Sequence, residues 1–176
     1  RKVRHPNIIQ LQEIWYNHSH PSLILEDGGV SLWSYAAKMS RITRASVFNP
    51  IFVQVLHAFN YLHKNHIIHC DVKATNILIK NDVVKVCDFG LARCVSGDDL
   101  GLLAYTMNYR PPEILAGNYN YNTQADMWAI GCVMYDFITH MMLFGKNKDD
   151  ETDEVIMQDI LLDVSTSREE LEEINA

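Results

Sequence analysis

The sequence predicts an α+β domain, in which strand-like runs occur together with long helical patterns. Apolar residues recur at three- and four-residue steps over 46–64, which indicates a helix with one buried face. Two β-rich runs, 77–79 and 83–87, flank a Lys-Asn-Asp turn sequence and predict a hairpin. Residues 123–140 are apolar on almost every side, which indicates a helix buried all round.

The composition supports a packed core and excludes several classes of protein. Of the 176 residues, 48% are hydrophobic and 21% are charged, and the net charge of −7 argues against a nucleic-acid scaffold. The most apolar stretch, 127–144, is interrupted by Asp136 and His140, so we expect no membrane span. Without a CxxC spacing, the four cysteines indicate reduced thiols and a cytoplasmic or nuclear location.

The other elements follow from local patterns. Residues 8–16 and the apolar run 22–26 predict two strands, the second one buried, and Ser31 is a candidate cap for a short helix. Pro50 falls near the start expected for the 46–64 helix, where proline is tolerated. The irregular stretch from Gly90 to about Gly117 is a long loop of the kind that usually carries function. Residues 154–162 predict another helix, and 167–174 are a further candidate.

Three short strings carry the chemistry. HCDVKATN occupies residues 69–76, DFG follows the hairpin at 88–90, and YRPPE occupies 109–113. In this order they resemble the catalytic loop, the magnesium-binding triplet and the end of the activation segment of the eukaryotic protein kinase family. DFG alone is only three letters, but a D-x-K-x-x-N string before a hairpin that ends in DFG is far more specific. The string DMWAIG at 126–131 resembles the start of a helix that the family places next.

The resemblance implies a protein kinase-like fold, mainly the helical C-terminal lobe with the last strands of the N-terminal lobe. Residues 1–26 would be a remnant of the N-terminal lobe with its fourth and fifth strands, 27–30 the hinge, and 31–176 a C-terminal lobe that is incomplete at its end. The family's glycine-rich loop, strand-3 lysine and helix-C glutamate would all precede His5. We therefore expect a fragment truncated at both ends, and inactive by itself.

The activity implied for the parent protein is transfer of the γ-phosphate of MgATP to a protein hydroxyl, which depends on positioning and charge neutralisation. Asp71 would accept or orient the hydroxyl proton, and Lys73 would offset charge on the moving phosphate. Asn76 and Asp88 would bind magnesium through hard oxygen ligands. Thr106 resembles the activation-segment threonine that contacts the catalytic Asp and Lys.

The resemblance also implies where ATP binds. Leu25 would stand at the gatekeeper position, and Leu78 would form the floor beneath the adenine. The backbone of Glu26, Asp27 and Gly28 would face the adenine edge as part of the hinge.

The lysine that follows Asp71 favours serine and threonine over tyrosine as substrates. The YRPPE string resembles the cyclin-dependent and mitogen-activated kinase branch, in which Arg110 would help to shape a pocket that favours proline after the target residue. We expect a protein substrate and a regulatory protein as partners, and neither nucleic acid nor a membrane.

One departure from the family concerns Cys70, which stands where most members have an arginine. That arginine pairs with a phosphate on the activation loop, so we expect this loop not to depend on phosphorylation in the usual way. The alternative to an active enzyme is a catalytically inactive kinase-like interaction module, which keeps the same residues.

Overall fold

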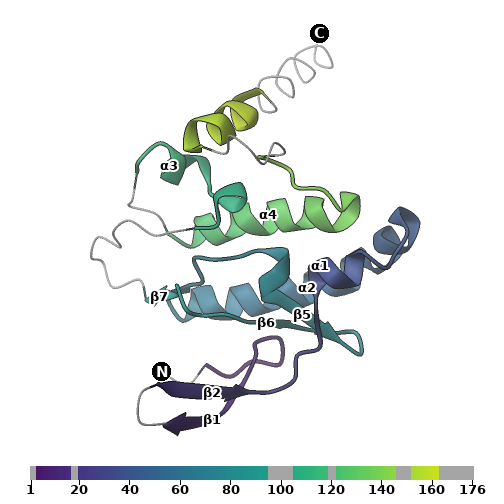
Figure 1. Ribbon diagram of the computed structural model, residues 1–176, viewed down its shortest axis with the longest axis vertical. Coiled ribbons are helices and arrows are strands. Elements are labelled where there is room, and N and C mark those ends of the chain that lie inside the picture. The colour runs from purple at the N-terminus through teal and green to yellow at the C-terminus, as the bar shows by residue number, and fades with distance from the viewer. Residues whose placement is uncertain (1–2, 17–19, 95–104, 119–121, 146–151, 163–176) are drawn as a thin grey trace.

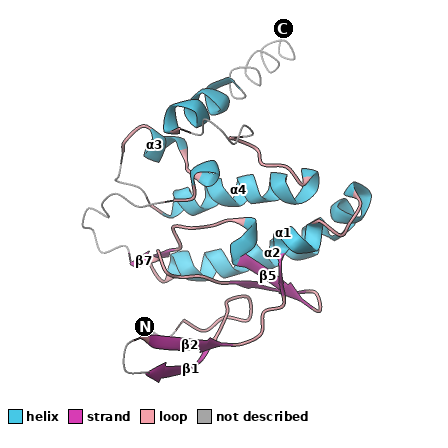
Figure 2. Cartoon of the chain, in the orientation of Figure 1, coloured by secondary structure: helices cyan, strands magenta, loops and turns pink. Residues whose placement is uncertain are grey.

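Strands and helices occupy successive layers of the structure. The computed structural model describes residues 3–16, 20–94, 105–118, 122–145 and 152–162. Its layers are an N-terminal hairpin, a small sheet against a long helix, a second long helix, and short helices at the far end (Figures 1 and 2). Helices mixed with small antiparallel sheets confirm the predicted α+β class. Within these ranges, no helix has both the length and the apolarity to cross a membrane.

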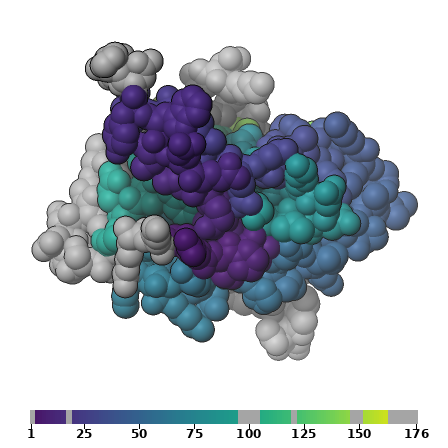
Figure 3. All heavy atoms as spheres, turned by 90° about the horizontal axis from the view of Figure 1, so that it is seen from below, coloured from purple at the N-terminus to yellow at the C-terminus, as the bar shows by residue number. Residues whose placement is uncertain are grey.

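The N-terminal hairpin pairs β1 (Leu11–Tyr16) with β2 (Pro21–Leu25) in antiparallel fashion. The strand predicted over 8–16 begins later, because Ile8 forms an isolated bridge elsewhere in the fold. Every residue of both strands is exposed, so the prediction of a buried strand over 22–26 is wrong. An apolar run indicates a strand, but only a packing partner can bury it, and no other described part of the chain covers this hairpin in Figure 3.

The next elements are β3 (Val30–Ser31) and α1 (Leu32–Ala36), followed by the long helix α2 (Arg41–Lys64). Ser31 caps α1 as predicted, since its hydroxyl accepts a hydrogen bond from the Ser34 amide at 3.2 Å. The turn into β3 depends on a glycine at position 29, which has a φ of +85°.

Helix α2 begins well before the residue predicted, Ser46. Its N-cap is Ser40, whose hydroxyl accepts a hydrogen bond from the Thr43 amide at 3.1 Å. The first turn has no apolar periodicity to reveal it, and its Ile42 side chain is 84% exposed. Pro50 therefore lies inside the helix on an exposed face, and the prediction that it lies near the start is wrong.

The second hairpin confirms its prediction. Strands β5 (Ile77–Lys80) and β6 (Val83–Val86) pair antiparallel, and β3 adds a third strand beside β5. The two turn residues, Asn81 and Asp82, have φ values of 49° and 62°, and this left-handed conformation suits tight hairpin turns.

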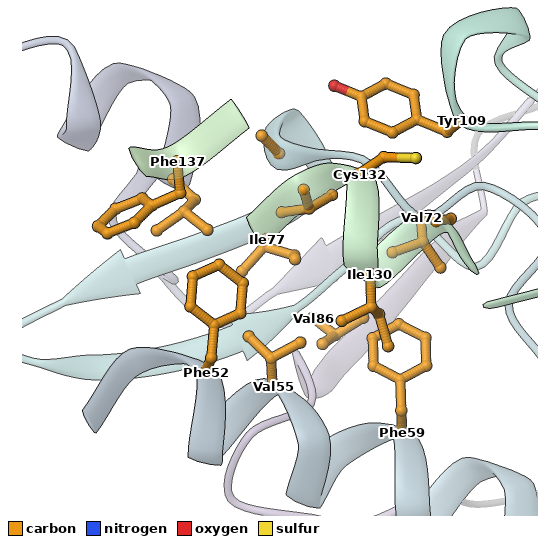
Figure 4. Packing of buried hydrophobic residues seen from close by; sticks show 14 of the residues in the cluster. Phe52, Val55, Phe59, Val72, Ile77, Val86, Tyr109, Ile130, Cys132 and Phe137 are labelled. Carbon is orange, nitrogen blue, oxygen red and sulfur yellow. The ribbon is translucent and has the colours of Figure 1, made fainter. Parts of the chain in front are cut away.

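The main core lies between α2, the second hairpin and α4 (Thr123–Thr139). Figure 4 shows aromatic and aliphatic side chains of α2 meeting those of α4 and of the hairpin: Phe52, Val55, Phe59, Ile77, Val86, Ile130 and Phe137. The prediction that α4 is buried all round is wrong at Met127. This side chain is 44% exposed and lies at the surface beside α2.

The segment 90–117 is irregular where the structure describes it, as predicted. Its short elements are β7 (Arg93–Cys94), which pairs with β4 (Ile67–Ile68), the 3-10 turn η2 (Met107–Tyr109) and α3 (Pro112–Leu115). Residues 153–162 are helical, which confirms the helix predicted over 154–162. The candidate helix over 167–174 lies outside the described residues.

Candidate active site

The 69–76 loop leaves β4 and enters β5 through a 3-10 turn, η1 (Ala74–Asn76). A buried carboxylate in the first turn of α4, Asp126, holds its start by accepting hydrogen bonds from the amides of His69 and Cys70 at 3.0 and 3.1 Å. His63 of α2 also contacts this carboxylate, with 2.8 Å between Nε2 and Oδ2. Sequence analysis did not anticipate the role of His63, because a contact between residues 63 positions apart has no local pattern.

Four of the predicted site residues meet at one carboxylate, that of Asp71. Thr106 donates its hydroxyl to Oδ1 at 2.7 Å, and Asn76 donates its amide to Oδ2 at 2.9 Å. The Lys73 ammonium lies 2.9 Å from Oδ2 and also donates to the Thr106 hydroxyl at 3.0 Å. Asp71 is buried, so these contacts satisfy a charge that water does not reach easily.

The surroundings of Asp71 keep it ionised. Burial by itself would raise its pKa, but the hydrogen bonds from Lys73, Thr106 and Asn76, together with the positive charge of Lys73, lower the pKa below its ordinary value. The carboxylate can therefore accept a further hydrogen bond from a hydroxyl at neutral pH.

Asp88 lies beside this network because of the second hairpin. The antiparallel register sets Ile77 opposite Val86, and the Cys87 amide donates to the Asn76 carbonyl at 2.9 Å. Asp88 itself has a φ of 62° and is exposed. The strand ends thus bring a carboxylate and a carboxamide to one place, and these are the oxygen ligands that Mg²⁺ prefers, completed by water and phosphate.

Among the residues that the structure describes, no group of three or more His, Cys, Asp or Glu side chains is placed so that it could hold a metal ion.

Three rings pack together behind the site. The centroids of His69 and Phe89 lie 4.9 Å apart, and the Phe59 ring of α2 lies 5.9 Å from that of His69. His69 Nε2 contacts the Cys87 carbonyl at 2.9 Å. Burial lowers the pKa of His69, so the ring is a neutral packing residue and not a proton carrier.

Four of the predicted nucleotide-binding residues, 25–28, lie where β2 runs into β3, and the fifth, Leu78, lies on β5. Gly28 packs so closely on Leu78 that a Cβ at position 28 would lie 2.6 Å from Leu78 Cδ1. The Glu26 carboxylate pairs with the Lys85 ammonium at 2.8 Å, and Asp27 pairs with Lys80 at 2.7 Å.

Leu25, the last residue of β2, is 45% exposed. A separate cavity of about 750 Å³ lies between β1 and β7, and its lining includes Ile9, Phe89 and Cys94 but none of the predicted nucleotide-binding residues.

Arg110 holds the end of the 90–117 segment in place through a hydrogen bond and an ion pair. Its Nε donates to the Tyr105 carbonyl at 2.9 Å, and its guanidinium pairs with Asp153 of the C-terminal helix at 2.6 Å. Beside it, the Tyr109 hydroxyl donates to buried Asp136 of α4 at 2.7 Å. Tyr109 and Arg110, which follow shortly after Thr106, are therefore bound to two different helices.

Comparison with known proteins agrees with this geometry. The family model described as "Protein kinase domain" matches residues 1–175. Mouse "Cyclin-dependent kinase-like 4" is 34% identical over 154 residues, which cover 86% of this chain and 45% of that protein.

Two further relatives carry similar names. Mouse "Cyclin-dependent kinase 10" is 34% identical over 162 residues, covering 89% of this chain and 45% of its own. Arabidopsis thaliana "Cyclin-dependent kinase E-1" is 33% identical over 160 residues, covering 82% and 34%. The chain spans less than half the length of these curated relatives.

Proposed function

The chain belongs to the protein kinase domain family, and we propose that the protein is a serine/threonine kinase of the cyclin-dependent-like branch, which transfers the γ-phosphate of MgATP to side chains of other proteins. The observation that carries this proposal is the network in which Asp71 is bonded by Lys73, Asn76 and Thr106. An ionised carboxylate beside a lysine ammonium is what positions a hydroxyl against a phosphate and neutralises the charge that develops.

The roles that we assign to the residues are those that the resemblance to protein kinases implies, and the contacts around Asp71 support them. Asp71 orients the substrate hydroxyl, and Lys73 offsets charge on the transferred phosphate. Magnesium, held through Asn76 and Asp88, supplies further neutralisation of the phosphates. Leu25 and the backbone of residues 26–28 line the adenine site, with Leu78 beneath it, which the close packing of Gly28 on Leu78 supports.

The same proposal divides the chain between the two lobes of the kinase fold. Residues 1–26 belong to the N-terminal lobe, 27–30 form the hinge and 31–176 belong to the C-terminal lobe. The separation of the β1–β2 hairpin from the helical layers supports this assignment (Figure 1).

We also propose that proline is favoured after the target residue. The Tyr105 carbonyl already accepts a hydrogen bond from the Arg110 guanidinium, so it is a poorer acceptor for the backbone amide of a substrate bound beside it. A proline has no amide hydrogen and leaves no donor unsatisfied there, whereas another residue would bury a donor without a partner.

The partners follow from the family. The names of the relatives describe kinases that depend on a cyclin, which supports a regulatory protein partner here. A cytoplasmic or nuclear location is a prediction that a fluorescent fusion of the full reading frame can test.

The test uses the full-length protein and a pair of peptides that differ only in Pro or Ala after the target serine. We expect radiolabel transfer that prefers the Ser-Pro peptide. Asp71→Asn should lower kcat by about 10²–10⁴-fold because the hydroxyl loses its acceptor. Asp88→Asn should abolish transfer because magnesium loses a charged ligand, while both variants keep the wild-type melting temperature.

Asp82→Asn is the matched control, since this turn aspartate adopts a φ of 62° that asparagine tolerates and lies outside the proposed site. Full activity in Asp71→Asn or Asp88→Asn contradicts the assignment. A folded full-length protein that binds a partner but transfers no phosphate supports the inactive interaction module instead.

A further inference from the structure

A second apolar cluster lies beside the active-site loop, apart from the main core. Its members come from the loop and the strand before it, the end of the 90–117 segment, α3 and the first turn of α4: Ile68, Cys70, Tyr105, Ile114 and Ala125, with Leu91 at the edge. The Tyr105 side chain is the largest of these and is only 2% exposed. One aromatic ring thus joins segments that all border the active site.

The cluster is neutral where the resemblance to kinases leads one to expect a cation. Burial, together with the nearby Asp126 carboxylate, raises the pKa of Cys70 to about 12, although weaker contributions from the Tyr105 hydroxyl and Arg93 oppose the shift. The thiol is therefore protonated at neutral pH. Arg93 is exposed and donates to the carbonyls of Leu91 and Ala92. A phosphate brought against Cys70 would lose water and gain no positive charge from that residue.

The backbone connects this cluster to the catalytic network. Tyr105 directly precedes Thr106, whose hydroxyl donates to Asp71 and accepts from Lys73. The Tyr105 carbonyl is fixed in turn by Arg110. With its ring buried on one side and its carbonyl bonded on the other, Tyr105 leaves Thr106 little freedom to leave Asp71.

We propose that Tyr105 is a positioning residue: its ring, packed on neutral Cys70, fastens the end of the activation segment to the catalytic loop and assembles the Thr106–Asp71–Lys73 network without a phosphate. This inference rests on the proposed kinase function, with Tyr105 and Cys70 acting together as an apolar latch. The latch replaces a phosphate–arginine pair, so phosphorylation is not required to order this part of the site.

A merely structural role for Tyr105 predicts something different. Truncation of any buried ring creates a cavity and lowers the melting temperature. Loss of the latch should in addition displace Thr106, and a misplacement of the order of 1 Å near the chemistry can cost about 100-fold in rate. The KM for ATP should stay unchanged, because Tyr105 is not among the nucleotide-binding residues.

The experiment compares Tyr105→Leu, Tyr105→Phe and Phe52→Leu in the full-length protein. Phe52 is a buried ring of the main core with the same 2% exposure, so its truncation is the control for lost stability. We expect Tyr105→Leu to lose at least about tenfold in kcat at unchanged KM for ATP. Tyr105→Phe keeps the ring and should stay within about twofold of wild type, as should Phe52→Leu well below its melting temperature.

Two further measurements keep the inference open to refutation. Wild-type protein treated with a broad-specificity phosphatase should keep its activity; a loss of most activity overturns the proposal, even if Tyr105→Leu fails to fold. Amide hydrogen exchange should rise in residues 106–110 and 71–76 of Tyr105→Leu but not of Phe52→Leu. This readout needs no phosphotransfer, so an inactive wild type with the expected exchange pattern counts against the proposed function and not against the latch. Unchanged kcat and unchanged exchange in Tyr105→Leu overturn the latch.

Discussion

Several charged residues of this protein lie inside its core and act through the hydrogen bonds that burial makes necessary. Asp126 and Asp136 of α4 are 0% and 1% exposed, and Arg44 of α2 is 8% exposed. Each spans segments that are distant in sequence: Asp126 joins α4 to the 69–76 loop, Asp136 joins α4 to Tyr109, and Arg44 joins the ends of two helices. A buried charge costs free energy unless it is bonded, so these residues specify which segments meet.

Asp136 gives the stability of the fold a pH dependence. Burial raises its pKa from 3.8 to about 6, although hydrogen bonds from the Tyr109 hydroxyl and the Leu143 amide oppose the shift. Between these two pH values the folded chain binds a proton that the unfolded chain does not, so this contribution to stability is present at low pH and is lost as pH rises through about 6.

We therefore predict a pH dependence in the difference between two urea midpoints, that of the wild type minus that of Asp136→Asn. This difference should be larger at pH 5 than at pH 7. Asparagine has no proton to bind in this range and still accepts from Tyr109, so it isolates the titration. An equal difference at the two pH values would show that Asp136 titrates normally.

Arg44 closes two helix ends at once. Its Nε donates to the Ile138 carbonyl in the last turn of α4, and one terminal nitrogen donates to the carbonyls of Ala36, the last residue of α1, and of Met39. Carbonyls at helix C-termini have no partners within the helix, and a cation there is favourable.

We predict that Arg44→Met lowers the free energy of unfolding by about 2–4 kcal/mol, because hydrogen bonds from a charged donor contribute about 1.5–3 kcal/mol each. Arg44→Lys should recover only part of this, since one ammonium nitrogen cannot replace both Nε, which bonds Ile138, and the terminal nitrogen, which bonds Ala36 and Met39. Chemical denaturation measures both, with Arg41→Met on the exposed start of α2 as the control. Equal stability of the Met variant and the wild type would mean that Arg44 only fills space.

At the scale of elements, the helix over 153–162 reaches back to the active-site segment. Its first residue, Asp153, pairs with the Arg110 guanidinium at 2.6 Å, and Arg110 in turn holds the Tyr105 carbonyl. The helix thereby helps to orient the group that we propose selects proline after the target residue.

We predict that Asp153→Asn lowers the preference for Ser-Pro over Ser-Ala peptides by about two- to fivefold, as partly exposed ion pairs contribute up to about 1 kcal/mol. Glu154→Gln removes a charge from the same turn without touching Arg110, so it should leave the ratio of the two kcat/KM values unchanged. The ratio itself is the measurement, and a full preference in Asp153→Asn would separate this helix from specificity.

For the molecule as a whole, the main feature is a core that ends before the N-terminal hairpin. The β1–β2 hairpin displays large apolar side chains, with Trp15 and Leu23 each 60% exposed and Tyr16 83% exposed. Exposed apolar patches and open strand edges both favour association with another surface.

We predict that the 176-residue chain, expressed by itself, self-associates through this hairpin. A Trp15→Lys, Leu23→Lys double variant should shift light-scattering masses toward the monomer, because the added charges, one on each face of the hairpin, replace exposed apolar side chains with groups that water solvates. Ile42→Lys, at an isolated exposed position on α2, should not change the mass. A monodisperse wild-type monomer with a sharp thermal transition would contradict the prediction.

The sequence by itself determined the elements and motifs whose signals are local. Hydrophobic periodicity and turn chemistry act over about a dozen residues. Stretches of that length are enough to encode the apolar face of α2, the Asn81-Asp82 turn and the loop around Asp71. Only the tertiary structure decided what is buried and what meets across the chain. The strands of the N-terminal hairpin, for example, have a strand-like sequence but remain exposed in the structure. The contacts of His63 with Asp126 and of Tyr105 with Cys70 join residues far apart in sequence. Burial is a property of partners, and partners that are distant along the chain leave no pattern at either position.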